Sequence, residues 1–210
     1  MNPRLTGGDP RSASPLLIGA GTALIVSGAM QFVGDTVYAL DRVYPGEPGF
    51  TFANLVAATW HVAMLMSLLV LTHFLWSRLG HLGRAGFVVS CIGLGLLIAA
   101  EVVTQAVGAI PVVLIATSAP LAGVGLILAG AGCLKAGLDR LLSVAVLMVG
   151  LYAVAVIVPT SAGPAGANYH VIAGWGLTWL LLGAATVRAR FTVTRTGAER
   201  SVALGYGATR

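Results

Sequence analysis

The chain has 210 residues, of which 57% are hydrophobic and only 9% are charged. A soluble domain of this length typically has about 25% charged residues, so the composition excludes an ordinary soluble domain and predicts an integral membrane protein. The net charge is +5, but the basic residues lie at the ends of apolar segments. We therefore interpret them as topology signals, and no nucleic-acid partner is expected.

Six apolar segments are long enough to cross about 30 Å of hydrocarbon as helices. In chain order they cover residues 15–40, 52–77, 85–108, 110–135, 140–160 and 168–188. Together they predict an all-α fold, a polytopic bundle of six transmembrane helices within residues 15–190. A polar N-terminal segment, residues 1–14, precedes the bundle, and a polar C-terminal tail, residues 191–210, follows it.

The basic residues predict the orientation of this bundle. With the N-terminus in the cytoplasm, eleven of the twelve basic residues are cytoplasmic and only Arg42 lies outside. The eleven are Arg4, Arg11, Arg78, Arg84, Lys135, Arg140, Arg188, Arg190, Arg195, Arg200 and Arg210. Such a bias predicts a multi-pass protein of the cell membrane with both termini in the cytoplasm.

Small residues recur four apart, for example at Gly19 and Ala23 and at Gly86 and Ser90, which suits close crossings between membrane helices. The two cysteines form no Cys-x-x-Cys or Cys/His spacing. We therefore expect no metal and no cofactor.

Polar side chains inside the first and third predicted helices share helical faces. Gln31 and Asp35 are four residues apart and Tyr38 is three further on, so the three lie on one face. Glu101 and Gln105 are also four apart. All five fall in the outer half of the predicted bundle.

The second and sixth predicted helices carry polar stripes at a similar depth. Asn54 and His61 are seven residues apart, and the last helix has a stripe formed by His170, Gly174 and Thr178. The simplest arrangement directs all four stripes at one another. We therefore predict one polar pocket, lined by Asp35, His61, Glu101 and the last helix.

Two carboxyl groups in hydrocarbon require an explanation. A charged residue at the centre of a bilayer costs at least about 2.5–3.5 kcal/mol on insertion scales, whereas hydrogen bonds between membrane helices average about 0.6 kcal/mol. Structural pairing of Asp35 and Glu101 with His61 is one interpretation. The hydrogen bonds would, however, stabilise the bundle by less than it costs to place the carboxyl groups in the bilayer. We prefer a catalytic one, in which Glu101 is an acid, Asp35 orients it or holds the other protonation state, and His61 is a base or hydrogen-bond partner.

Aromatic and polar side chains near these groups are candidate substrate-binding residues. Aromatic faces stabilise cations by up to about 2 kcal/mol when desolvated. An interfacial aromatic belt also explains Trp60, Trp76 and Tyr169. The candidates are Gln31, Phe32, Tyr38, Trp60, Gln105, Tyr169, His170 and Trp175.

An acid with aromatic walls in a lipid-accessible pocket is what acid-initiated cyclisation of an isoprenoid requires. In size, helix count and the placement of Glu101 and Asp35, the chain resembles the small integral-membrane terpene cyclases of bacteria and fungi. The resemblance implies terpene or meroterpenoid biosynthesis, with these two residues as the acids and a lipophilic small molecule from the bilayer as substrate. The fungal members have an additional helix, and no DDxxD or DxDD element is present here.

Three other classes remain open. Intramembrane carboxyl groups also occur in proton-linked transporters, here of a small lipophilic solute, although no inverted repeat is evident. A haem b carrier needs two histidines at one depth, and His61 and His170 differ in depth by several ångströms. A non-catalytic membrane subunit is the third alternative. The sequence does not determine the oligomeric state.

Overall fold

The computed structural model describes residues 13–41, 44–161 and 168–206. All regular structure in these ranges is helical. In chain order the elements are α1 (Ala13–Leu40), α2 (Phe50–Leu75), α3 (His81–Val107), α4 (Val112–Lys135), α5 (Arg140–Tyr152), the π-helix η1 (Ala153–Ile157), α6 (Val158–Ser161) and α7 (Tyr169–Tyr206). Residues 1–12 of the predicted polar N-terminal segment lie outside the described residues.

Six helices in the described part of the chain are long and apolar enough to cross a membrane. The predicted segments match them except at the end of α7, which was expected at residue 188 and extends to Tyr206. The next largest difference is at the start of α3, which was expected at residue 85 and begins at His81. Large apolar side chains are exposed on the outside of the bundle, among them Phe52 at 74% and Val113 at 75%. Such a surface is stable in lipid rather than in water, and it supports the prediction of a multi-pass membrane protein.

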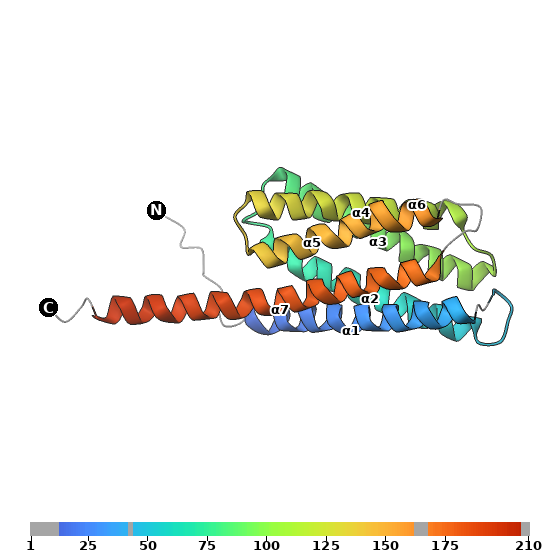
Figure 1. Ribbon diagram of the computed structural model, residues 1–210, viewed down its shortest axis with the longest axis horizontal. Helices are drawn as coiled ribbons and strands as arrows, with labels where there is room; N and C mark the ends of the chain where they lie inside the picture. Colours follow the sequence, from blue (N-terminus) through green and yellow to red (C-terminus); the bar gives the residue numbers. More distant parts are fainter. Residues whose placement is uncertain (1–12, 42–43, 162–167, 207–210) are drawn as a thin grey trace, which may run out of the picture.

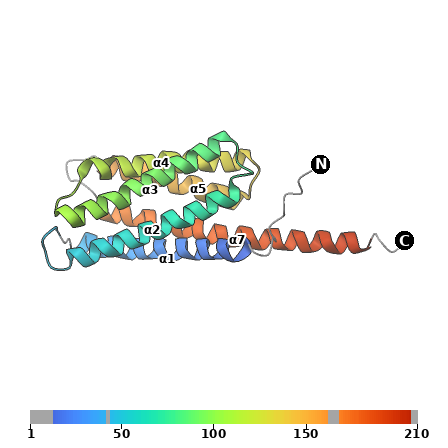
Figure 2. The same ribbon diagram turned by 180° about the vertical axis from the view of Figure 1, so that it is seen from behind.

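The six long helical segments form a closed ring. Each packs against two neighbours, in the order α1, α2, α3, α4, α5 and α7, with α7 returning to α1. Figures 1 and 2 show α1 and α7 side by side, and α3, α4 and α5 on the other side of the bundle. The first and last helices of the chain are therefore direct neighbours.

Glycines seven residues apart bring α1 and α7 into backbone contact. A Cβ added to Gly28 would lie 2.5 Å from the carbonyl oxygen of Gly176, and one added to Gly183 would lie 2.5 Å from that of Gly21. A seven-residue spacing keeps these positions on one face where two helices cross at a shallow angle. We call this interface, defined by Gly21, Gly28, Gly176 and Gly183, the α1/α7 glycine seam.

A second seam of the same kind joins α3 and α4. Its members are Gly86, Gly93, Gly125 and Gly132, again seven apart on each helix. A Cβ on Gly93 would lie 2.8 Å from the Cα of Ala122 and from the carbonyl oxygen of Ser118. The predicted pair of Gly86 and Ser90 does face this interface.

The predicted pair of Gly19 and Ala23 does not pack in this way. Among the described residues no atom lies within 4 Å of a Cβ added at Gly19, which is exposed. The close approach occurs two residues later, at Gly21, because that is the position that faces α7. The four-residue pattern in α1 thus indicated a contact on the wrong face.

The fifth predicted helix contains one π-helical turn. The N–H of Val158 donates to the carbonyl of Ala153, five residues back. Pro159 follows directly, and a proline ring clashes with the carbonyl four residues before it, so the wider turn relieves the crowding at Ala155. The helix then continues to Ser161.

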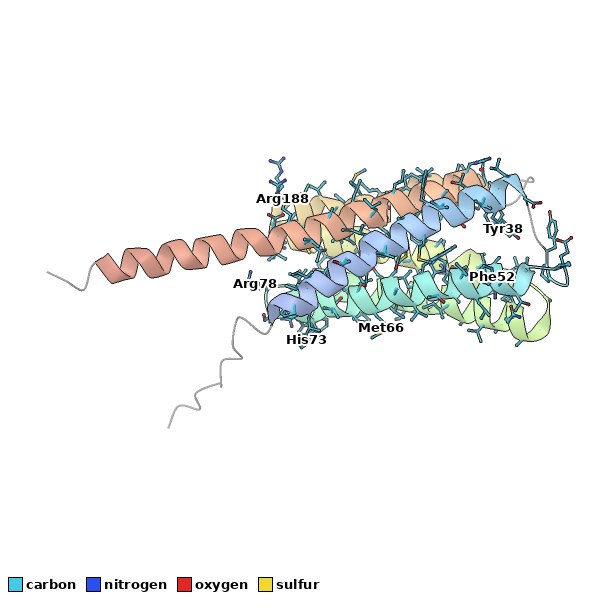
Figure 3. All side chains as sticks on the ribbon, turned by 90° about the horizontal axis from the view of Figure 1, so that it is seen from below. Tyr38, Phe52, Met66, His73, Arg78 and Arg188 are labelled. Carbon is cyan, nitrogen blue, oxygen red and sulfur yellow. The ribbon has the colours of Figure 1, made fainter. Side chains whose placement is uncertain are left out.

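The two ends of the bundle differ in chemistry. Figure 3 shows His73, Arg78 and Arg188 at one end and Tyr38 and Phe52 at the other. This distribution agrees with the clustering of basic residues on one side of the sequence-predicted topology.

Helix α7 projects beyond the basic end of the bundle and stays helical to Tyr206 (Figure 1). Residues 191–206 of the predicted polar tail are therefore helical. No proline follows Pro164 in the sequence, so no residue of that kind interrupts the helix.

Candidate functional site

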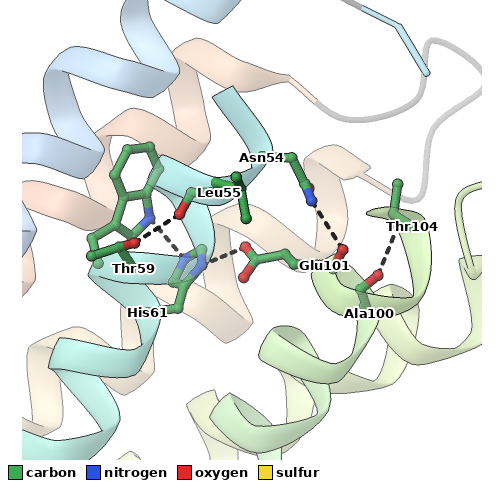
Figure 4. A network of polar contacts seen from close by, with 8 residues as sticks. Asn54, Leu55, Thr59, His61, Ala100, Glu101 and Thr104 are labelled. Carbon is green, nitrogen blue, oxygen red and sulfur yellow. Dashed lines mark hydrogen bonds and ion pairs between the residues drawn. The ribbon is translucent and has the colours of Figure 1, made fainter. Parts of the chain in front are cut away.

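A buried pair of side chains joins α2 to α3. Nδ1 of His61 lies 2.6 Å from Oε1 of Glu101, and the two side chains are only 8% and 11% exposed. Figure 4 shows Glu101 extending from α3 toward His61 on α2. A contact of this length indicates a strong hydrogen bond between the two side chains.

The other nitrogen of His61 also has a partner. The indole N–H of Trp60 donates to Nε2 of His61 over 3.2 Å. Trp60 is buried, and Gly34 on α1 leaves room for its ring, because a Cβ there would lie 2.6 Å from the indole. A glycine on one helix thus positions a side chain that orients the histidine on the next.

Asp35 on α1 completes the group. Its carboxylate accepts a hydrogen bond from the side chain of Gln31 and interacts electrostatically with His61 and Glu101. The predicted meeting of polar stripes from the first three helices is therefore observed. We call Gln31, Asp35, His61 and Glu101 the carboxyl cluster.

Asn54 extends the contacts between α2 and α3 toward the start of α2 and the end of α3. Its side-chain amide donates to the backbone carbonyl of Glu101 over 3.0 Å and lies 3.4 Å from Oε1 of Gln105. Gln105 in turn donates to the hydroxyl of Thr51 over 3.1 Å. Asn54 thus fixes the backbone of α3 at the residue whose side chain reaches His61 (Figure 4).

Three buried oxygens of the carboxyl cluster have no hydrogen-bond partner among the described residues. They are Oε1 of Gln31, Oδ2 of Asp35 and Oε2 of Glu101. All three are acceptors in the ionised form of the acids, and a buried polar atom without a partner costs roughly 1–3 kcal/mol. The cluster therefore has capacity to exchange a proton or to accept from a bound group.

The polar stripe on the last helix does not face this cluster. Gly174 lies against the hydroxyl end of Tyr152 on α5, and the Thr178 hydroxyl donates to the carbonyl of Trp175 in its own helix. His170 is exposed. The expected fourth wall of the pocket is thus directed toward α5, because the α1/α7 glycine seam fixes which face of α7 turns to α1.

The predicted substrate-binding residues separate into three groups. Gln31 contacts Asp35, Trp60 contacts His61, and Gln105 contacts Asn54. Tyr38 and Tyr169 pack against each other with ring centroids 4.4 Å apart and ring planes tilted by 58°. Phe32 and His170 are exposed, and Trp175 donates to the carbonyl of Val149.

An open apolar groove runs between α1 and α2. Its lining includes Gly19, Ala23 and Met30 of α1 and Trp60 and Ala63 of α2. The indole of Trp60 belongs both to the groove and to the hydrogen-bond chain that ends at Glu101. The groove therefore adjoins the carboxyl cluster at His61, which accepts the hydrogen bond from Trp60.

The role of Trp60 as a partner of His61 was not predicted. Adjacent residues in a helix point about 100° apart, so helical spacing does not predict a contact between them. The signal that could have indicated it is Gly34, a small residue one position before Asp35 that makes space for a large ring. Because both ring nitrogens of His61 are engaged, the histidine offers no free ligand atom for haem iron.

The carboxyl cluster combines two acids, a histidine and unpaired acceptor oxygens in an apolar surrounding. Such a group can donate, accept and relay protons. No protein-family model, curated protein or solved structure matches the chain. The resemblance to membrane terpene cyclases therefore stays a prediction.

Proposed function

We propose that the chain is an integral-membrane enzyme that performs acid–base chemistry on a lipophilic, isoprenoid substrate. The reaction would be an acid-initiated cyclisation of a terpene or meroterpenoid. The observation that carries the proposal is the buried Glu101–His61 pair, which has Asp35 beside it and two carboxyl oxygens without a partner.

The steps follow from the chemistry of the three side chains. Neutral Glu101 donates its proton to an epoxide oxygen or a terminal double bond and becomes a carboxylate. A neighbouring double bond of the same molecule attacks the resulting carbocation, which closes a ring. Asp35 then accepts a proton from the cyclic cation, a new double bond forms, and return of this proton to Glu101 restores the enzyme.

Structural pairing alone explains the carboxyl cluster less well. A cluster that served only to hold helices together would have its buried oxygens satisfied, as most buried polar atoms are. Here three acceptors have no partner in the part of the chain that the structure describes. The α1/α7 and α3/α4 interfaces moreover close through glycines, so the bundle has other means of cohesion.

The groove between α1 and α2 supports a substrate that arrives from the bilayer. It is open and apolar, and it borders Trp60, which contacts the histidine of the cluster. A prenyl chain is of the same apolar class as the groove lining. We infer that the substrate approaches the cluster from this side.

We also propose that both termini are cytoplasmic and that the protein lies in the cell membrane. Eleven of the twelve basic residues support this orientation. The carboxyl cluster would then lie in the outer half of the bilayer. Reporter fusions at the C-terminus and in the loop between α1 and α2 should report opposite sides; equal labelling of both would contradict the orientation.

A product assay tests the reaction. Membranes containing the wild type, Glu101→Gln or Asp35→Asn would be supplied with epoxidised and unmodified prenylated substrates, and products would be read by chromatography and mass spectrometry. We expect an isomeric product of unchanged mass, reduced roughly 10²–10⁴-fold in the Glu101 variant, the range for loss of a general acid. Glu47→Gln is the matched control, because Glu47 is an exposed carboxylate in the loop before α2.

The outcome that contradicts the proposal is product formation that Glu101→Gln and Glu47→Gln leave equally intact. If every well-expressed sample fails to form product across the substrate panel, proton-coupled uptake into vesicles is the next measurement. Uptake that depends on Glu101 would replace the enzyme proposal by the transporter class.

A further inference from the structure

The hydrogen bond between Trp60 and His61 has a direction that chemistry determines. An indole N–H can only donate, so Nε2 of His61, 3.2 Å away, must accept and carries no proton. A neutral imidazole has one protonated nitrogen. The proton of His61 is therefore on Nδ1.

This tautomer determines what Glu101 can do. Nδ1–H donates to Oε1 of Glu101 over 2.6 Å, so Oε1 is an acceptor in that contact. When Glu101 is neutral, its proton then belongs on Oε2. That oxygen is buried and has no partner among the described residues.

We infer that Trp60 is a positioning residue that locks His61 in the Nδ1–H tautomer and thereby confines the transferable proton of Glu101 to Oε2. The inference deepens the proposed function and rests on it for its catalytic meaning. The tautomer itself is a property of the resting protein and is independent of any substrate.

The opposite tautomer shows why the lock matters. With the proton on Nε2, the Nδ1 lone pair would accept from Glu101, and the acid proton would sit on Oε1, pointing at the histidine. It would then be held in an internal hydrogen bond. In the observed arrangement the proton leaves from Oε2, and the Nδ1–H bond at Oε1 stabilises the carboxylate that remains.

The packing of α1 against α2 maintains this arrangement. The Trp60 ring is 6% exposed and rests at Gly34, where a Cβ would lie 2.6 Å from one ring carbon and 2.9 Å from another. Gly34→Ala should therefore displace the indole without altering any hydrogen-bonding group. It gives a second route to the same effect as removing the indole N–H.

The experiment is nitrogen NMR of protein labelled with ¹⁵N-histidine, in which His61→Gln identifies the signal of His61. The wild type should show a protonated Nδ1 and an unprotonated Nε2 at neutral pH. Trp60→Phe, which removes the N–H and keeps an aromatic ring, should add a population protonated on Nε2. Trp179→Phe is the matched control, because Trp179 is equally buried and its N–H has no partner among the described residues.

Two results would overturn the inference. One is a wild-type His61 that is protonated on Nε2 or on both nitrogens. The other is a spectrum that neither Trp60→Phe nor Gly34→Ala changes while both variants remain folded. If Trp60→Phe fails to fold, the wild-type spectrum and Gly34→Ala still decide.

Turnover separates this inference from the proposed function. Where the enzyme forms product, Trp60→Phe should lower its rate roughly fivefold to tenfold, the change expected from one lost hydrogen bond, and Trp179→Phe should not. If the Nδ1–H tautomer is confirmed in a protein that never forms product, the proposed enzymatic function is contradicted and the inferred role of Trp60 in fixing the tautomer still holds.

Discussion

The α1/α7 and α3/α4 interfaces and the α2/α3 interface hold one bundle together by different means. At the first two interfaces, glycines allow the two backbones to come into direct contact. Helix α2 contains no glycine between Phe50 and Leu75 and meets α3 through His61, Asn54 and their partners. The glycine seams depend on shape, whereas the α2/α3 junction depends on hydrogen bonds that a proton can change.

The acidic residues and the histidine thus lie at the α2/α3 junction, where they disturb the close packing of the bundle least. Packing between membrane helices gains little from the hydrophobic effect, so close approach at small residues supplies much of the stability. Polar groups on a seam would force the backbones apart. At the junction, by contrast, large side chains leave room for two acids and a histidine, so substitutions in the two regions should have different consequences.

The largest expected effect comes from breaking the buried pair at the junction. His61→Leu should lower the free energy of unfolding in detergent by about 3 kcal/mol, because it leaves the Glu101 carboxyl buried without its partner. Adding Glu101→Leu should recover most of this loss, since both polar groups are then absent. Thermal and denaturant unfolding of the two single variants and the double variant measures the coupling; strictly additive losses would contradict it.

The seams should respond to a single methyl group. Gly28→Ala places a Cβ 2.5 Å from the carbonyl oxygen of Gly176 and 2.6 Å from the N of Leu180. We expect a loss of about 2 kcal/mol, within the usual range for overpacking, with the carboxyl cluster unaltered. Gly19→Ala in the same helix is the control, since the space there is open; equal melting temperatures for the two variants would refute the seam.

An intermediate case lies between α5 and α7. The indole N–H of Trp175 donates to the carbonyl of Val149 over 3.1 Å, whereas that of Trp179 has no partner among the described residues. Trp175→Phe should therefore cost about 1 kcal/mol more than Trp179→Phe, although both remove the same atoms. Chemical unfolding of the two variants side by side gives this difference, and a larger loss for Trp179→Phe would count against it.

The smallest effect should come from the outermost contact of the junction. Asn54→Leu removes the hydrogen bond to the Glu101 carbonyl but no charge. A loss of about 0.6 kcal/mol is expected, the average for hydrogen bonds between membrane helices. Unfolding measurements would show it, and a loss as large as that of His61→Leu would mean that Asn54, rather than the buried pair, dominates the junction.

The helices and three of the polar stripes could be predicted from the sequence. Long apolar segments bounded by glycine, proline and charge define the ends of membrane helices, so the boundaries agree within a few residues except at the end of α7, where the helix continues through the polar segment to Tyr206. The side chains of Asp35, His61 and Glu101 lie together because the polar faces of neighbouring membrane helices turn toward one another rather than toward lipid.

The sequence does not predict which faces of the helices pack against each other. Gly19 and Gly21 lie two residues apart, and only the position of α7 shows that Gly21 is the contact. The same placement turns Gly174 toward Tyr152 of α5 and leaves His170 exposed. The order of the helices in the ring depends on the whole chain, and the spacing of residues within one helix does not predict it.

The ring order also affects how the chain is made. Helix α1 is synthesised before the other five long helices, yet one of its most extensive interfaces is with α7, which emerges from the ribosome after them. Until then Gly21 and Gly28 face lipid, while α3, α4 and α5 can already assemble through contacts between consecutive helices. Closure of the bundle, and with it the final position of Asp35 against α2 and α3, therefore waits until α7 has been synthesised. A ribosome that stalls before α7 would leave an open and chemically incomplete bundle in the membrane.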